Sequence, residues 1–212
     1  SIYPLDGDTP AELLRNADSA MYHSKAEGRN SCHYFTQEMN IGAERRLLLE
    51  DKLHGALARK ELYVLYQPVI DLQSQQIVGA EALLRWHSKE LGLVSPVEFI
   101  PIAEHTGLII EIGQFVLNEA LEQTQKWMKE LSPTFHIAIN LSPRQFRDAA
   151  LVDSIHEKML HYGINGKNIE LEITEGVLMS QHADIDNAIA QLNELGISIS
   201  MDDFGTGYSS LS

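Results

Sequence analysis

Cysteine, basic residues and long apolar runs are scarce in this chain of 212 residues. Cys32 is its single cysteine, so no disulfide can form within the chain and a thiolate metal site is disfavoured. Lys and Arg number 16 against 30 Asp and Glu, which gives a formal net charge of -14. This balance argues against binding of duplex nucleic acid, which requires basic side chains to displace phosphate counterions. A nucleotide substrate stays compatible with the charge, because bound metal cations can reverse the local field.

The chain also lacks targeting features. No apolar run approaches the roughly 20 residues of a membrane-spanning helix. Its start, SIYPLDGDTP, lacks the basic and apolar regions of a signal peptide. Together with the single cysteine, these features predict a cytoplasmic protein, or the cytoplasmic part of a membrane-anchored one. Because the chain has no initiator methionine, we expect it to be a piece of a longer protein.

The N-terminal part predicts a helix, a short strand and a second helix. Thr9 and Glu12 fit a capping box with Pro10 at the first helical position, and apolar residues recur at helical spacing as far as Gly28. The stretch NSCHYF predicts a strand. The second helix is predicted from about Met39 to Lys60, with leucines along one stripe.

After residue 61 strands and helices alternate. FHIAINLS, NIELEIT and ISISMDD are strand-like and are separated by two helical patterns, and LYVLYQPVIDL and QIVGAEALLRWH are strand-like upstream. The strands are nearly continuous apolar runs, which is typical of parallel strands buried on both faces. The order predicts an α/β fold with a parallel sheet, but it does not distinguish an open sheet from a closed barrel.

Polar residues interrupt these strands near their carboxyl ends, the edge where active sites of parallel α/β folds form. Those expected to converge there are Glu81, Asn140, Glu172, Asp202 and Asp203. Such like charges repel one another unless they are protonated or bound to cations. An all-oxygen set favours hard ions such as Mg²⁺ or Mn²⁺, and a pair of ions is an arrangement used for phosphodiester cleavage. Taken alone, the adjacent aspartates have a simpler interpretation, as acids that cap a strand end and bind water.

Several motifs, in this order, resemble the EAL domain of bacterial cyclic-diguanylate phosphodiesterases: YQPVIDL, EALLRW, NLSPRQF, LEITE and DDFGTGYSSL. The preceding YPLDGDTPAELLRNADSAMYHSKAEGRN resembles the last part of a GGDEF domain, the diguanylate cyclase fold. The resemblances imply a tandem GGDEF-EAL protein with a GGDEF remnant at 1–36, a linking helix at 37–60 and the N-terminal part of an EAL domain at 61–212. The implied fold is a modified TIM-type (β/α) barrel, incomplete in this chain, preceded by a short α+β remnant.

The tripeptide EAL occurs twice. The copy that begins at Glu119 lies in a helical pattern, where three good helix formers need no further explanation. The copy that begins at Glu81 is followed by Arg85 and Trp86 at the end of a predicted strand. We therefore assign the site to the first copy.

The resemblance implies roles for the site residues. Glu81, Asn140, Glu172 and Asp202 would bind one metal ion, and Asp202 with Asp203 would bring in the second. Catalysis would depend on Glu81 and the two aspartates, with two Mg²⁺ or Mn²⁺ ions as cofactors.

Three further residues have roles implied by the resemblance, each with a simpler alternative. Arg85 would hold a substrate phosphate, or else cap a carbonyl at the surface. Gln67 would contact a guanine edge, or else satisfy a loop at the edge of the core. Glu175 would anchor the loop Phe204–Ser210 after the double aspartate, or else be an exposed acid at a helix N-terminus.

The implied activity is hydrolysis of cyclic di-GMP to linear pGpG by the parent protein. The chain ends before the family's later Lys-Ile-Asp motif and metal-proximal glutamate, so we expect it to be inactive alone. The alternative is a non-catalytic receptor for cyclic di-GMP, and a third interpretation is a regulatory or dimerisation element. Expected partners are cyclic di-GMP, a second copy that forms a homodimer through the EAL domain, and upstream sensory domains.

Overall fold

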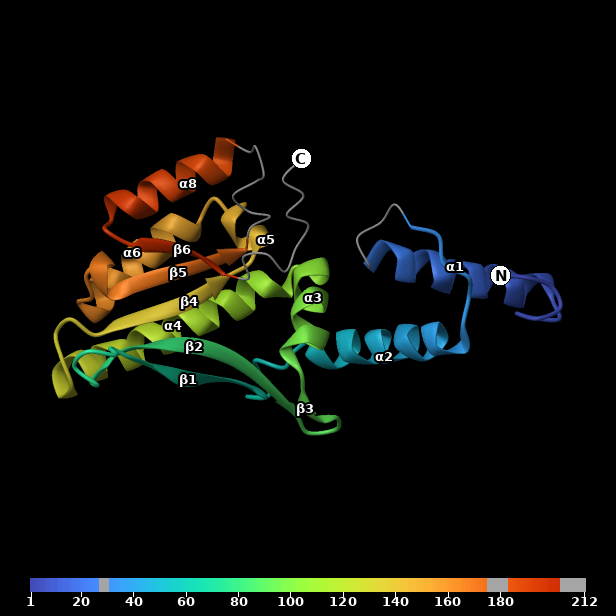
Figure 1. Ribbon diagram of the computed structural model, residues 1–212, viewed down its shortest axis with the longest axis horizontal. Coiled ribbons are helices and arrows are strands. Elements are labelled where there is room, and N and C mark those ends of the chain that lie inside the picture. Colours follow the sequence, from blue (N-terminus) through green and yellow to red (C-terminus); the bar gives the residue numbers. More distant parts are fainter. Residues whose placement is uncertain (27–30, 175–182, 203–212) are drawn as a thin grey trace. The chain divides into compact units, whose positions relative to one another are not determined.

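The computed structural model describes residues 1–26, 31–174 and 183–202 (Figure 1). Asp203, Glu175 and the loop 204–210 lie outside the described residues, as does the side chain of Asp202. The chain divides into two compact units, Ser1–His54 and Gly55–Ser212, and each unit is described by itself.

The first unit contains α1 (Pro10–Ala26) and α2 (Gln37–Leu53). The predicted capping box of α1 is confirmed, since the Glu12 amide donates to Thr9 Oγ1 at 3.2 Å and the Thr9 amide donates to Glu12 Oε2 at 3.1 Å. The two helices are joined by polar side chains, with Asn40 Nδ2 of α2 donating to Asn16 Oδ1 of α1 at 3.0 Å.

Two expectations for this unit are wrong. The described part of NSCHYF, residues 31–35, forms no strand, and no other strand among the described residues of this unit offers it backbone partners. The described part of the expected α+β remnant at 1–36 therefore contains one helix, α1, and no strand. The linking helix ends at Leu53 rather than Lys60. Gly55 and Lys60 have φ angles of +73° and +57°, which an α-helix cannot accommodate.

The second unit is built on one mixed sheet with the spatial order β1-β2-β4-β5-β6, and β3 also pairs with β2. The strands are β1 (Leu62–Ile70), β2 (Ile77–Ser88), β3 (Gly92–Val94), β4 (His136–Leu141), β5 (Ile169–Thr174) and β6 (Ser198–Asp202). β1 and β3 run antiparallel to β2, whereas β2, β4, β5 and β6 run parallel to one another. Within the described residues β1 and β6 are the end strands, so these strands form an open sheet.

Helices connect the parallel strands, as such connections require (Figure 1). They are α3 (Pro96–Thr106), α4 (Leu108–Glu130), the one-turn α5 (Pro143–Phe146), α6 (Leu151–Tyr162) and α8 (Ala183–Glu194), with a short 3₁₀ turn at Gly166–Asn168. The predicted strand-helix order from FHIAINLS onward is confirmed. Gly107, with a φ of 90°, ends α3 and lets α4 start in a new direction.

Side chains alternate between the two sides of the parallel strands. Ile137, Ile139, Leu171 and Ile173 are at most 1% exposed and form one side of β4 and β5, on which α4 and α6 help to build the core. The intervening positions of β5 are glutamates that are only partly buried. The apolar residues of β5 therefore lie on one side, whereas the second side of β4 carries buried Ala138 beside exposed Asn140.

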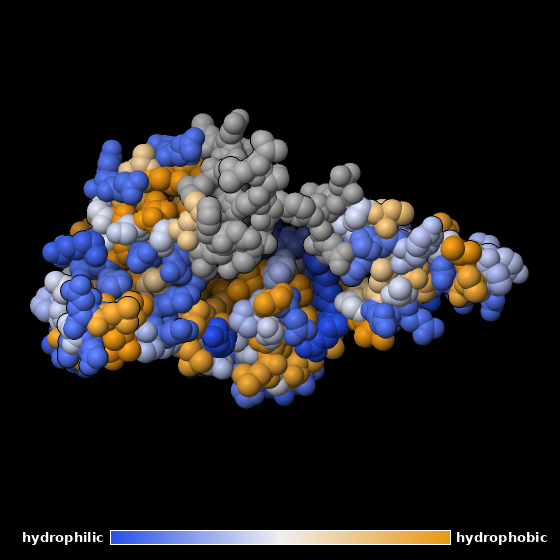
Figure 2. Space-filling model, in the orientation of Figure 1, coloured by the Kyte–Doolittle hydropathy of each residue, from blue (hydrophilic) through white to orange (hydrophobic). Residues whose placement is uncertain are grey.

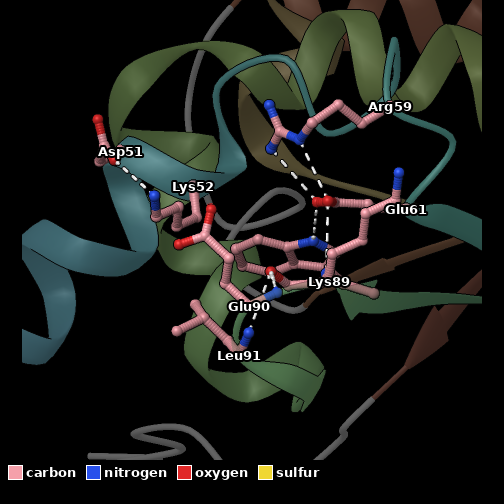
Figure 3. A network of polar contacts seen from close by, with 9 residues as sticks. Asp51, Lys52, Arg59, Glu61, Lys89, Glu90 and Leu91 are labelled. Atoms are coloured by element: carbon pink, nitrogen blue, oxygen red, sulfur yellow. Dashed lines mark hydrogen bonds and ion pairs between the residues drawn. The ribbon is translucent and has the colours of Figure 1, made fainter.

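A buried carboxylate fixes the start of β1 to the β2–β3 hairpin (Figure 3). Glu61 is 5% exposed, and its two carboxylate oxygens accept hydrogen bonds from Arg59 Nε at 3.1 Å and Arg59 Nη2 at 3.2 Å. Trp86 Nε1 and the Lys89 amide donate to the same carboxylate at 3.4 Å each. Hydrogen bonding from Arg59 is the main reason why the pKa of Glu61 is lowered. The ion pair is therefore part of the fold.

No single helix among the described residues has the length and apolar character of a membrane span. The α3–α4 pair passes that test only when taken together, across a bend of 119°. Hydrophobic and hydrophilic areas are interspersed on the visible face of the molecule (Figure 2).

Candidate functional site

Glu81 and Asn140 meet on neighbouring strands. Asn140 Nδ2 on β4 donates a hydrogen bond to Glu81 Oε1 on β2 at 2.9 Å. Residue 140 lies close to the carboxyl end of β4, where its strand continues into the loop before α5. The Asn140 nitrogen is used on Glu81, so its amide oxygen is left as an acceptor.

The strand register extends this pair across the sheet. Glu81 is opposite Ala138, Asn140 is opposite Glu172, and Thr174 is opposite Asp202. Each step along a strand is of two residues, so all these positions belong to the same side of the sheet. Glu81, Asn140 and Glu172 thus lie on one side of three adjacent strands, and the backbone of Asp202 continues the row on the fourth. The expected convergence is confirmed for these strand positions.

The two residues assigned to the substrate lie beside this row. Gln67 on β1 is exposed and is opposite Glu81 in the antiparallel register. Arg85 follows Glu81 by four residues on β2, so the two side chains lie on the same side of the strand, and Arg85 is partly buried. Its Nη1 donates to the Leu84 carbonyl at 2.9 Å, the contact of the simpler alternative. A guanidinium group has five N–H donors, so this bond uses only one of them.

A cavity of about 300 Å³ opens at the carboxyl ends of β2, β4 and β5. Arg85, Asn140 and Glu172 contribute polar groups, and α3 and α4 supply apolar walls through residues such as Ile100 and Ile112. This volume is at the lower end of the range for small-molecule sites. An apolar pocket with a few convergent polar groups is the usual form of such a site.

Glu104 and Gln145 are among the polar residues of this cavity that sequence reasoning did not identify. Glu104, at the end of α3, is partly buried, and burial raises the pKa of its carboxyl. Gln145 is 5% exposed and closes the capping box of α5, where its Oε1 accepts from the Ser142 amide at 3.0 Å. Neither lies on a strand, so the alternation that identified the other residues carries no signal for them. Only the capping pattern Ser-x-x-Gln could have drawn attention to Gln145.

The predicted metal ions require oxygen ligands. Glu81, Asn140 and Glu172 offer carboxylate and amide oxygens, the ligand types that Mg²⁺ and Mn²⁺ prefer. Across residues 1–26, 31–174 and 183–202, no group of three or more His, Cys, Asp or Glu side chains is placed to hold a metal. Two carboxylates and one amide in the described part of the site match a hard cation by ligand type, without forming a cluster of three acids. The predicted contributions of Asp202 and Asp203, and the anchoring role of Glu175, stay predictions.

Comparison with known proteins agrees with this geometry. The chain matches the EAL domain family over residues 50–212. It is 44% identical over 212 residues to the bifunctional diguanylate cyclase/cyclic di-GMP phosphodiesterase MucR of Pseudomonas aeruginosa. That alignment covers 100% of this chain and 31% of MucR. It is 36% identical over 211 residues to the cyclic di-GMP phosphodiesterase NbdA of the same organism. This alignment covers 100% of the chain and 27% of NbdA. The chain thus spans about a third or less of these curated relatives.

Solved structures give the same result. The PaMucR phosphodiesterase in its c-di-GMP complex superimposes with a TM-score of 0.71 at 41% identity, covering 77% of this chain and 66% of that one. The EAL enzyme Bd1971, bound to cAMP and cyclic-di-GMP, gives a TM-score of 0.73 at 33% identity, covering 97% and 54%. The α/β fold with its mixed sheet is therefore the TIM-barrel-like fold of these proteins. By sequence, fold and the arrangement of the strand-end residues, the chain belongs to the EAL domain family.

Proposed function

We propose that the protein containing this chain hydrolyses cyclic di-GMP to linear pGpG in a metal-dependent reaction. The observation that carries the proposal is the row formed by Glu81, Asn140 and Glu172 beside a cavity that also contains Arg85. Membership of the EAL family and the relatives named as cyclic di-GMP phosphodiesterases support the choice of substrate.

The cavity offers the two kinds of contact that a cyclic dinucleotide requires. Arg85 has one guanidinium N–H on the Leu84 carbonyl, and its remaining donors suit the oxygens of a phosphodiester. Leu84, Pro96 and Ile100 supply apolar surface for the plane of a base. Gln67, opposite Glu81 on β1, has an amide that can both donate to and accept from a guanine edge. The cavity is small, so we assign it to one half of the dinucleotide.

Glu81, Asn140 and Glu172 would hold the first divalent ion, and Asp202 with Asp203 would hold the second. When bound, Mg²⁺ or Mn²⁺ supplies charge neutralisation at the phosphate and acidifies a water molecule. The hydrogen bond from Asn140 fixes the orientation of the Glu81 carboxylate and leaves the Asn140 oxygen as an acceptor. Arg85 would hold the phosphodiester beside this row, which lowers the entropy cost of orienting it for reaction.

Several finer assignments belong to the same proposal. Glu175 would anchor the loop after the double aspartate, and residues 1–36 would be the end of a GGDEF domain. Two copies would pair through the EAL domain. These assignments rest on the sequence motifs and on the alignment of the whole chain with bifunctional MucR.

Product analysis tests the function directly. The intact protein is incubated with cyclic di-GMP and Mn²⁺, and the products are separated by chromatography, with a parallel sample in excess EDTA. We expect linear pGpG with Mn²⁺ and none with EDTA. Persistent cleavage in EDTA would refute the metal-dependent mechanism. Tight binding of cyclic di-GMP without any cleavage would establish the receptor instead of the enzyme.

A further inference from the structure

Ser200, in the middle of β6, has a hydroxyl group without a partner. Its Oγ is inaccessible to solvent and makes no hydrogen bond to any residue that the structure describes. A buried hydroxyl without a partner destabilises the folded state, because it has lost its hydrogen bonds to water. Such a group in a native protein calls for an explanation, and a functional role is one of the few available.

The other buried polar atom of this kind within the described ranges is Asn168 Oδ1. Asn168 has a structural role through its nitrogen, which donates to the carbonyls of Pro133 at 3.1 Å and Phe135 at 2.9 Å. These bonds tie the start of β5 to the loop before β4. The cost of its oxygen without a partner is therefore offset by two hydrogen bonds from the same side chain. Ser200 makes no such compensating bond through its side chain.

The position of Ser200 relates it to the candidate site. Ser200 is opposite Glu172 in the parallel register of β5 and β6. The strands of a sheet lie about 4.8 Å apart, and residues opposite each other in a register share one side of it. Ser200 and Glu172 are therefore side-by-side neighbours in the row that also contains Asn140. A serine hydroxyl and a glutamate carboxylate at this spacing are within reach of a hydrogen bond once the glutamate adopts a suitable rotamer.

We propose that Ser200 is a positioning residue for Glu172. When the site holds a divalent ion, the Ser200 O–H would donate a hydrogen bond to the Glu172 carboxylate and fix its orientation. Carboxylates that bind metals are commonly held by such outer hydrogen bonds, and loss of one typically weakens metal binding by about 10- to 100-fold. The inference rests on the proposed function, since it assigns Glu172 as a metal ligand. It also explains why the chain tolerates a buried hydroxyl without a partner.

The test is a Mn²⁺ titration of the intact protein, with free ion counted by electron paramagnetic resonance. We expect Ser200→Ala to weaken Mn²⁺ binding about 10-fold and Ser200→Thr, which keeps the hydroxyl, to restore it. Ser198→Ala is the matched control, because residue 198 lies on the same strand and the same side but is exposed and opposite Glu170. It should bind Mn²⁺ as the unaltered protein does. The melting temperature of the metal-free Ser200→Ala variant should stay the same or rise, because an unsatisfied group has been removed.

A double-mutant cycle with Glu172→Ala decides whether Ser200 acts through Glu172. In that background Ser200→Ala should have no further effect on Mn²⁺ affinity. An undiminished effect there, unchanged affinity in the single variant, or a lower melting temperature without metal would each overturn the positioning role. In all three cases cleavage and EDTA sensitivity of the unaltered protein would still support the proposed function. Unchanged Mn²⁺ binding by Glu172→Ala itself would overturn both.

Discussion

Glu61 and Glu81 belong to the same β1–β2 part of the sheet but have different surroundings. The Glu61 carboxylate is 5% exposed, is paired with Arg59 and accepts further bonds from Trp86 and the Lys89 amide (Figure 3). The Glu81 carboxylate is partly buried and accepts a hydrogen bond from Asn140, a neutral amide. Glu172 lies one strand beyond Asn140 on the same side of the sheet, so a second acid is close to Glu81.

The difference distinguishes a carboxylate that stabilises the fold from one to which the proposed function assigns a metal ion. Around Glu61 the chain supplies a cation and several donors, which is the condition for keeping a charge buried without loss of stability. In the row of Glu81 and Glu172 two acids share one side of the sheet with the neutral Asn140, and the proposed function assigns a cation to them. Replacement of either kind of acid should therefore affect different properties.

The largest effect is expected for loss of the site acid. Glu81→Ala should lower the rate of cyclic di-GMP cleavage at least about 100-fold, because a group that stabilises charge in the reaction is removed. Glu119→Ala, in the second EAL tripeptide, should leave the rate within about twofold, since an exposed helical position tolerates the change. The Glu119 backbone carbonyl, which accepts from Tyr66 at 3.0 Å, is kept in that variant. Single-turnover rates measure both, and similar losses would mean that the site is misplaced.

The reverse order is expected for stability. Glu61→Gln should lower the free energy of unfolding by about 2 kcal/mol, because hydrogen bonds to a charged group are lost in a buried position. Glu81→Gln keeps an acceptor for Asn140 and should change it by less than about 1 kcal/mol. Urea unfolding of both metal-free variants gives these values. A Glu81 variant that is the less stable of the two would remove the distinction between the two acids.

Smaller effects are expected from the ionisation of Glu61 and Glu104, which change the stability of the fold in opposite directions. The pKa of Glu61 is lowered by Arg59, so ionised Glu61 stabilises the fold above the ordinary carboxyl pKa of about 4.3, and this contribution is lost as the pH falls toward the folded pKa. The pKa of Glu104 is raised by burial, so ionised Glu104 destabilises the fold near neutral pH. Glu104→Gln should therefore be more stable at pH 7 by about 0.5 kcal/mol.

The difference in unfolding free energy between the unaltered protein and either variant, Glu61→Gln or Glu104→Gln, should shrink as the pH is lowered. Each carboxyl then becomes neutral like its glutamine replacement. Unfolding free energies of the two variants and the unaltered protein between about pH 3 and 7 measure this, a range that spans the ordinary carboxyl pKa. A Glu104→Gln variant that is less stable at pH 7 would show that the carboxylate is held by partners rather than penalised by burial.

The sequence was sufficient where chemistry follows the period of a strand. Glu81, Asn140 and Glu172 interrupt apolar strands, and the parallel register puts them on one side of the sheet. The expected place near a carboxyl end is wrong for Glu81, because β2 continues to Ser88 in its pairing with β1 and β3. Ser200, two residues before Asp202 on the same side of β6, was not identified, because its place opposite Glu172 comes from the register of β5 and β6. Glu104 reaches the cavity through the packing of α3, a tertiary contact that no local pattern encodes.

Boundaries were less predictable. The helical stripe of leucines continues past Leu53, but the backbone turns at Gly55, and the conformation of Lys60 depends on the contacts that follow it. NSCHYF has strand-like composition, yet a strand also requires a neighbour for its hydrogen bonds. The burial of β5 differs from the expected burial on both faces, because its second side carries Glu170 and Glu172, which are only partly buried.

The central claim is that the row of Glu81, Asn140 and Glu172 is a catalytic site, and two glutamates on β5 test it most directly. Glu172 and Glu170 share one strand, one side of the sheet and partial burial, but Glu172 is opposite Asn140 whereas Glu170 is opposite Ala138. Single-turnover cleavage of cyclic di-GMP at saturating Mn²⁺ is measured for Glu172→Gln and Glu170→Gln in the intact protein. The account predicts a loss of at least about 100-fold for Glu172→Gln and a change within about twofold for Glu170→Gln. Equal rates for the two variants would contradict it.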